Sequence, residues 1–368
     1  MSSRVSPYFA GLDALRIFAA LSVLAYHVMG RNAWADVPTS GPLAWIRCGW
    51  VGVDVFFAIS GLVVGQSALA RFRREGPAFR RAFARQRWAR IAPLYLLTGL
   101  ACWLLLPPRP AGIEAVFQIA THLAFLHNLW PATIVSINPP SWSLAVEMQL
   151  YALLMLATPW LARQGALRVA AASVVFALAY RVAAYALLRA VGVDDAGLWA
   201  HAIAQTPGLL DSFGLGVAAS MALARAQPPR PGAPACLLLI GLGLAVLLLL
   251  GLETSRRMLA QALWNEPVYA LVMRSGVALG AASLVFGCAL LPLRSATRGA
   301  AALRLGGHLS YGVYLWHFLV FSELGKVEHL GAWGLLAAVT AATLLLSWCT
   351  WITLERPVLR RVQRPPIN

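Results

Sequence analysis

The sequence predicts an all-α integral membrane protein with about ten transmembrane helices and both termini in the cytoplasm. Two observations predict this class: the composition of the chain and the succession of apolar runs along it. Of the 368 residues, 60% are hydrophobic and 12% are charged, and the mean hydropathy is +0.69. Soluble domains are roughly 45–50% apolar and about 25% charged. No long polar block exists to form another unit, so we expect one transmembrane domain over residues 1–368.

Each expected span is a run of about 20 predominantly apolar residues, the length that crosses the hydrocarbon core. The first run carries Asp13 and Arg16 where a cleavable signal peptide needs an uncharged stretch, so we expect it to be retained. The candidate runs are residues 9–29, 46–69, 91–106, 114–130, 143–161, 169–191, 207–224, 235–252, 268–291, 308–322 and 331–354.

The run at 114–130 is the exception, because the arginines argue against it. Residues 70–90 hold eight arginines and one glutamate, which predicts that they and the N-terminus lie in the cytoplasm. A full span at 114–130 would place every later arginine cluster outside, whereas without it most of the Lys and Arg fall inside. The run is also rich in polar side chains that suit lipid poorly. We therefore expect a re-entrant or surface segment near residues 108–140 on the outer side.

The net charge of +16 raises nucleic acid as a partner. The arginines lie in short clusters between apolar runs, however, which is typical of contact with an anionic cytoplasmic membrane surface. We therefore expect membrane lipid and no nucleic acid as a partner. The five cysteines are isolated residues, and no group of His and Cys has zinc spacing, so we expect no metal.

Arg16 and His27 are ionisable residues within the first expected span, where charge is costly and usually faces a cavity or a partner. They are eleven residues apart, which places them on one helix face, separated by about 16 Å of rise. Arg16 lies near the cytoplasmic end and His27 near the outer end. They therefore suit the two ends of one tunnel, with snorkelling of each side chain to its own interface as the alternative.

Polar residues of three other spans are expected near the level of His27. A carboxylate beside a histidine supports a general base, because it fixes the tautomer and stabilises the imidazolium. For the two carboxylates, buried pairing between helices is the alternative. The residues are Asp54, with Ser60 deeper in the same span, Glu147, Tyr314 and His317.

A basic level is expected below these residues, towards the cytoplasm. Arg87 and Arg90 enter the third span there, at the depth of Arg16. Arginine binds phosphate oxygens through two parallel hydrogen bonds, so this level suits an anionic, phosphate-bearing ligand. Ordinary positive-inside charge is the alternative for Arg87 and Arg90.

Six segments in order resemble the membrane-bound acyltransferase-3 family, and they extend from Gly11 to Pro357. They are GLDALRIFAALSVLAYH, VGVDVFFAISG, RQRWARIAPLY, SWSLAVE, LGGHLSYGVYLWH and LERP. The resemblance implies a multi-pass O-acyltransferase of the bacterial inner membrane. Such an enzyme takes an acyl group, usually acetyl, from cytoplasmic acyl-CoA and delivers it to a hydroxyl at the outer face. A stand-alone chain is expected, without the extracytoplasmic hydrolase-like domain fused to many relatives.

The resemblance implies a site that contains Arg16, His27, Arg87, Arg90, Glu147, Tyr314 and His317, and the order of depth adds Asp54 and Ser60. Taken together, the expected catalytic residues are His27, Asp54, Glu147, Tyr314 and His317, and acetyl-CoA is expected to bind Arg16, Ser60, Arg87 and Arg90. We expect His27, oriented by Glu147 or Asp54, to deprotonate the acceptor hydroxyl for direct attack on the thioester. A covalent variant would pass the acyl group through His27 or Tyr314.

The acceptor is not defined by the sequence. A sugar hydroxyl is expected, with a lipid-linked exopolysaccharide or lipopolysaccharide unit first. Peptidoglycan, periplasmic glucans and small molecules such as macrolides stay open, as does the oligomeric state. The alternative function is a transporter or flippase for an anionic lipid-linked sugar, which would use the same tunnel. Transporters tend to show two similar halves with interrupted helices, and no such halves are visible here.

Overall fold

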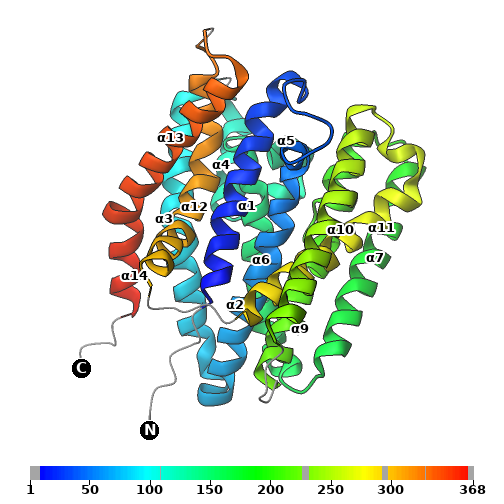
Figure 1. Cartoon of the computed structure of the whole chain (residues 1–368), viewed down its shortest axis with the longest axis vertical. Helices are drawn as coiled ribbons and strands as arrows, with labels where there is room; N and C mark the ends of the chain where they lie inside the picture. The colour runs from blue at the N-terminus through cyan, green and yellow to red at the C-terminus, as the bar shows by residue number, and fades with distance from the viewer. Residues whose placement is uncertain (1–8, 108, 226–231, 292–296, 328, 364–368) are drawn as a thin grey trace.

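The computed structural model describes residues 9–107, 109–225, 232–291, 297–327 and 329–363, and all regular structure within them is helical. Long helices lie side by side with their axes roughly aligned (Figure 1). The predicted all-α membrane fold is confirmed. The α-helices are α1 (Ala10–Met29), α2 (Gly52–Glu75), α3 (Phe79–Leu105), α4 (Gly112–Leu123), α5 (Pro131–Ile134), α6 (Trp142–Leu161), α7 (Ala166–Ala190), α8 (Asp195–Leu198), α9 (Leu210–Arg225), α10 (Ala233–Leu259), α11 (Pro267–Leu290), α12 (Arg298–Leu324), α13 (Ala332–Thr350) and α14 (Arg356–Gln363).

Eight helical stretches of the described residues are long and apolar enough to cross a membrane. One of them, Ala44–Leu105, runs through α2 and α3, which are joined by the short 3-10 turn Gly76–Ala78. The helix α12 is 27 residues long but is not among the eight. The count of ten spans therefore stays a prediction.

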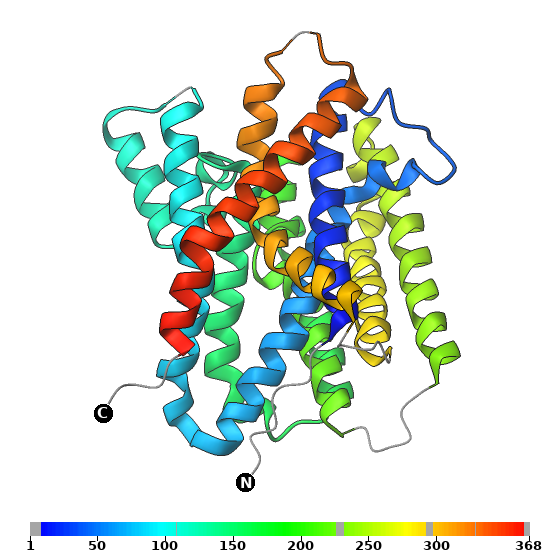
Figure 2. The same ribbon diagram turned by 60° about the vertical axis from the view of Figure 1, so that its left-hand side comes forward.

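The helix α4 overlaps the run at 114–130 and has only 12 residues. It is about 18 Å long, well short of the hydrocarbon core of about 30 Å, so it does not span the membrane. Figure 2 shows α4 towards the end of the molecule opposite the turn between α2 and α3. This position agrees with the expected surface or re-entrant segment, of which residue 108 lies outside the described residues.

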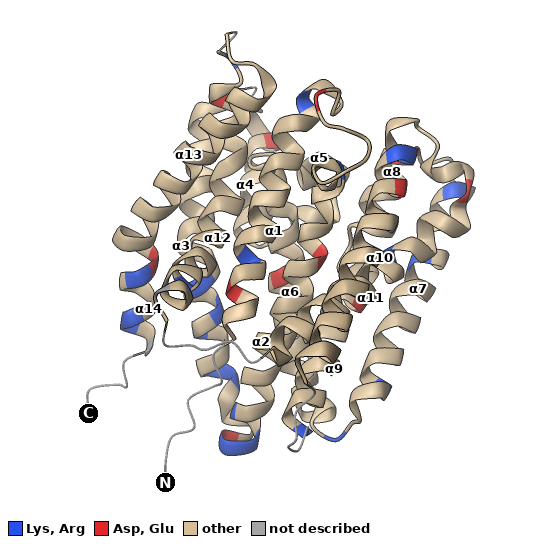
Figure 3. Cartoon of the chain, in the orientation of Figure 1, with Lys and Arg blue, Asp and Glu red and all other residues tan. Residues whose placement is uncertain are grey.

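The two ends of the molecule differ in charge. Figure 3 shows Lys and Arg gathered around the turn that joins α2 to α3 and around α14. The start of α1 and the end of α14 both lie towards this end (Figure 1). By the positive-inside rule this is the cytoplasmic end, and that sidedness stays a prediction.

Close helix contacts position the functional site. The backbones of α2 and α9 approach so closely that a Cβ at Gly61 would collide with the backbone of α9 at Phe213. Similarly, a Cβ at Gly307 of α12 would lie 2.5 Å from Asp13 Oδ1 of α1. Small residues at such contacts are typical of membrane helices, where close packing replaces hydrophobic burial as the driving force. They hold α1, α2 and α12 around a common interior.

Candidate active site

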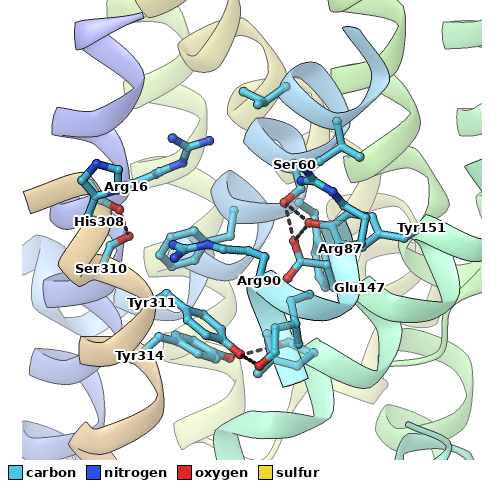
Figure 4. Close-up of a pocket in the computed structure, with 18 of the residues that line it drawn as sticks. Arg16, Ser60, Arg87, Arg90, Glu147, Tyr151, His308, Ser310, Tyr311 and Tyr314 are labelled. Atoms are coloured by element: carbon cyan, nitrogen blue, oxygen red, sulfur yellow. Dashed lines mark hydrogen bonds between the residues drawn. The ribbon is translucent and has the colours of Figure 1, made fainter. Parts of the chain in front are cut away.

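A cavity of about 460 Å³ lies between α1, α2, α3, α6, α12 and α14, and we refer to it as the basic cavity. Figure 4 shows Arg16, Arg87 and Arg90 arranged around it. The three arginines lie towards the end of the molecule that is predicted to be cytoplasmic, and they come together as the predicted basic level requires. Its other polar lining residues are Asp13, Ser60, Gln86, Ser143, Glu147, Tyr151, His308, Ser310, Tyr311 and Tyr314.

Arg87 is the arginine of the basic cavity that lacks an anionic partner within the described part of the chain. Its Nε is buried without a hydrogen bond, and its guanidinium lies 5.9 Å from the ring centres of Phe83 and Tyr151. Arg87 is partly buried, and a cation that is partly removed from water without a counter-charge is unfavourable. Its guanidinium is therefore available to an anion in the basic cavity.

The other two arginines are held by carboxylates. Arg16 Nη1 lies 3.0 Å from Asp13 Oδ1, one turn earlier in α1. Arg90 Nη1 lies 3.0 Å from Glu355 Oε2. Each guanidinium keeps further N–H donors for a ligand, because arginine has five. The two ion pairs fix where those donors point.

The segment that carries Glu355 is a π-helical turn, Trp351–Glu355, between α13 and α14. It delivers two side chains to the basic cavity: Glu355 pairs with Arg90, and Trp351 stacks on His308 with ring centres 4.3 Å apart. Turns of this kind are frequent at functional sites. Glu355 and His308 lie in the quoted segments LERP and LGGHLSYGVYLWH, but neither residue had been assigned a role. Both are far from Arg90 in the sequence, so no spacing pattern indicated that they would meet it.

Glu147 lies on the wall of the basic cavity, where its Oε1 accepts hydrogen bonds from Ser60 and Tyr151. Glu147 had been expected at the level of His27 and above Ser60, whereas the structure places it beside Ser60. Glu147 does not hydrogen-bond to His27, as had been expected. Tyr151, four residues after Glu147 on the same helix face, belongs to this cluster and was missing from the predicted site.

His27 pairs instead with His317, and neither residue lines the basic cavity. His317 Nε2 lies 3.1 Å from His27 Nδ1, and His317 Nδ1 lies 3.2 Å from the carbonyl oxygen of Val313. A carbonyl only accepts, so Nδ1 of a neutral His317 carries the hydrogen and its Nε2 accepts from His27 Nδ1–H. This tautomer leaves a lone pair on His27 Nε2, as a general base requires.

Asp54 lies away from both histidines and from the basic cavity. Its Oδ2 is 3.3 Å from Arg274 Nη1, and its Oδ1 accepts a hydrogen bond from Ser212. The neighbouring pair Arg181 and Asp211 is equally buried. The expectation that Asp54 orients His27 thus differs from the structure, which shows the alternative of pairing between helices. The reason is the direction in which the side chain leaves the helix. Six residues separate Asp54 from Ser60, which is about 240° around the helix axis, so the two side chains point to different sides of α2.

Tyr314 connects the basic cavity to the histidine pair. It lines the cavity, and its ring centre is 5.9 Å from that of His317. Its hydroxyl donates to the carbonyl of Pro140 at 2.8 Å and lies 2.7 Å from Ser143 Oγ. These contacts hold the ring between α12 and α6. Among the described residues, no group of three or more His, Cys, Asp or Glu side chains could hold a metal ion.

The fold and this site define a multi-pass membrane protein whose basic cavity leads, past Tyr314, to a pair of hydrogen-bonded histidines. The chain belongs to the acyltransferase-3 family, whose model, described as an acyltransferase domain, matches residues 9–352. It is 27% identical to acyltransferase MdmB of Streptomyces mycarofaciens, over 96% of this chain and 92% of that protein.

Two further relatives match over part of the chain. O-acetyltransferase OatA of Staphylococcus aureus is 27% identical over 42% of this chain and 25% of its own length. YrhL of Bacillus subtilis, which carries a provisional assignment as a peptidoglycan O-acetyltransferase, is 30% identical over 39% of this chain and 23% of its own length. No solved structure is significantly similar to the chain. The relatives support O-acyl transfer as the class of reaction.

Proposed function

We propose that the protein transfers an acyl group, in the first place acetyl, from cytoplasmic acyl-CoA to a sugar hydroxyl at the outer face of a bacterial inner membrane. One observation carries the proposal: the basic cavity starts at Arg87 and ends at Tyr314, beside the His27–His317 pair. Membership of the acyltransferase-3 family supports it. Acetyl-CoA would be the donor substrate, and the acceptor a lipid-linked exopolysaccharide or lipopolysaccharide unit.

The donor would bind with its phosphates at the cytoplasmic end of the basic cavity. Arg87 offers an unpaired cation there, and Arg16 and Arg90 add directed N–H donors. The rise from Arg16 to His27 is about 16 Å, comparable to an extended pantetheine arm. The thioester would therefore pass Ser60 and Glu147 and reach Tyr314, next to the histidine pair.

The chemical step follows from the assigned tautomers. His27 Nε2 takes the proton of the acceptor hydroxyl, and the oxygen attacks the thioester carbonyl carbon. The new C–O bond forms, the C–S bond breaks, and the proton on His27 passes to the leaving CoA thiolate. His317 accepts the hydrogen bond from His27 Nδ1–H, which orients the base and stabilises its imidazolium, as a carboxylate does in hydrolase triads.

The test uses inside-out membrane vesicles with acetyl-CoA that carries a labelled acetyl group, followed by isolation of labelled glycan. His27→Gln should reduce labelling to background. His329→Gln, which changes an exposed histidine, should leave it unchanged. An active His27→Gln protein would overturn the proposal, and so would transport of a lipid-linked sugar with the thioester intact, as a flippase requires. Labelled protein that accumulates without acceptor would favour the covalent variant. Mass spectrometry of surface glycans from a deletion strain would identify the acceptor.

A further inference from the structure

The basic cavity ends before it reaches the proposed base. Phe56 and Tyr314 line it, whereas His27 and His317 do not. His317 is completely buried, and His27 is half-buried. The exposed part of His27 therefore does not face the basic cavity. A donor in the cavity is thus separated from the histidine pair by the side chains that lie between them.

Phe56 of α2 is one of two side chains in this position. It lines the basic cavity, and it also packs against the apolar cluster that contains Leu24 and Val313. Leu24 lies three residues before His27 in α1. Val313 lies four residues before His317 in α12. These spacings place both apolar residues on the helix faces that carry the histidines, so Phe56 fills space between the cavity and the histidine pair.

Tyr314 of α12 is the other side chain in this position. Its ring centre is 5.9 Å from that of His317 and 5.8 Å from that of Phe56, which it meets edge to face. Its hydroxyl donates to the Pro140 carbonyl at 2.8 Å and accepts from Ser143 Oγ at 2.7 Å. A hydroxyl has a single hydrogen, so Tyr314 has none left for a thioester in this arrangement. Its contacts instead hold the ring across the end of the cavity.

We propose that Phe56 and Tyr314 form an aromatic barrier, which keeps the donor thioester away from His27 until an acceptor hydroxyl is bound there. The proposal rests on the proposed function and adds the residues that favour acyl transfer over hydrolysis. Without a barrier, His27 would deprotonate water as readily as an acceptor, and acetyl-CoA and water would give acetate, a proton and CoA. An acceptor at His27 contacts the thioester only when the barrier is open, and this contact favours the open arrangement.

Two variants weaken the aromatic barrier by different means. Tyr314→Phe keeps the ring but removes both hydrogen bonds of the hydroxyl. Phe56→Leu keeps an apolar side chain but removes the aromatic pair. A net hydrogen bond or an aromatic pair changes an equilibrium by about twofold to tenfold. Each variant should therefore raise the release of acetate from acetyl-CoA without acceptor by about twofold to tenfold.

Two matched variants control for the loss of a hydroxyl bond and of a buried ring. Tyr180 of α7 donates to the carbonyl of His201 at 2.7 Å, so Tyr180→Phe removes a similar bond away from the basic cavity. Phe79 is completely buried and meets Phe72 edge to face, so Phe79→Leu removes an aromatic pair at the turn between α2 and α3. Neither variant should change the release of acetate.

The assay uses the full-length protein in lipid nanodiscs with acetyl-CoA that carries a labelled acetyl group, and thermal unfolding checks that each variant is folded. His27→Gln in the Tyr314→Phe protein should return acetate release to background, because the same base activates water. Unchanged release in both barrier variants, or release that persists without His27, would overturn the barrier. Loss of both transfer and hydrolysis in Tyr314→Phe would also overturn it, because the hydroxyl would then take part in the chemistry.

The proposed function fails in a different way. Acetate release that rises in both barrier variants, with no glycan labelled by the wild type, would refute the transferase and leave the barrier standing in a hydrolase. Glycan labelling by the wild type, with acetate release unchanged in both barrier variants, would refute the barrier and leave the transferase standing. A protein that cleaves no acetyl-CoA in any variant would refute both.

Discussion

His317 offers the sharpest test of the chemistry, because its proposed role follows from its contacts with His27 and with the Val313 carbonyl. His317→Phe keeps an aromatic ring of similar shape beside His27 but removes the acceptor for His27 Nδ1–H. His27 would still be present, yet its imidazolium would lose one charge-assisted hydrogen bond. The fold should change little, because the lost bond to the Val313 carbonyl lies within one helix.

The magnitude of this effect can be worked out from the contact. A hydrogen bond to a charged group contributes roughly 1.5–3 kcal/mol, and about 1.4 kcal/mol corresponds to a factor of ten in rate. His317→Phe should therefore lower kcat by about 10- to 150-fold. Loss of the base itself, in His27→Gln, should cost about 10²- to 10⁴-fold. His317→Gln retains an acceptor oxygen and should fall between wild type and His317→Phe.

Steady-state release of CoA in the presence of acceptor measures kcat, and a fluorescent CoA analogue measures donor affinity. Donor affinity should stay within about twofold of wild type, because the basic cavity is not lined by His317. Thermal unfolding of the purified variant controls for misfolding. A folded His317→Phe protein with wild-type kcat would refute the assigned tautomers. A variant that loses donor affinity instead of kcat would place His317 at the donor end.

Three further outcomes are expected from the basic cavity and its supports. Arg87→Gln should raise the KM for acyl-CoA by about tenfold or more with kcat unchanged. Arg85→Gln, which changes an exposed neighbour, should leave the KM unchanged. Equal effects of the two variants would show that Arg87 contributes only general surface charge. Glu355→Gln should raise the KM for acyl-CoA about threefold to tenfold, because the ion pair with Glu355 positions Arg90. A lower KM would instead show that the carboxylate of Glu355 repels the donor. Gly307→Ala, whose Cβ would lie 2.7 Å from the Cβ of its neighbour in α1, should destabilise the protein by about 1–3 kcal/mol in thermal unfolding. Gly306→Ala, with 3.2 Å of room, should cost less, and the reverse order would contradict the packing.

Depth along the membrane was predictable from sequence only in part, although the rise per helical residue is fixed. Glu147 was expected at the level of His27 and above Ser60, whereas the structure joins Glu147 to Ser60 by a hydrogen bond. The surface or re-entrant segment that contains α4 was expected from the arginine clusters and from the polar side chains of the run at 114–130. Arg16, Arg87 and Arg90 meet around one cavity as their shared depth suggested.

Azimuth was not predictable, because the face that a helix turns to each neighbour is set by packing between distant segments. Asp54 has the expected depth, but the close contact of α2 with α9 at Gly61 turns it towards Arg274. The partner of His27 therefore proved to be His317 rather than either carboxylate. Periodicity identifies the residues that share a face, whereas only the assembled helices decide which faces meet.

The partner of His27 is a histidine and not the expected carboxylate, and this difference has a chemical consequence. An acid next to His27 would place a negative charge beside the path of an anionic donor, whereas a neutral His317 accepts the same hydrogen bond without one. The acids of the basic cavity are correspondingly engaged: Asp13 with Arg16 and Glu147 with two hydroxyls. The phosphates of the proposed donor would thus meet positive charge at the predicted cytoplasmic end, and its thioester would meet uncharged side chains near Tyr314. This difference in charge favours a donor that enters with its phosphates last.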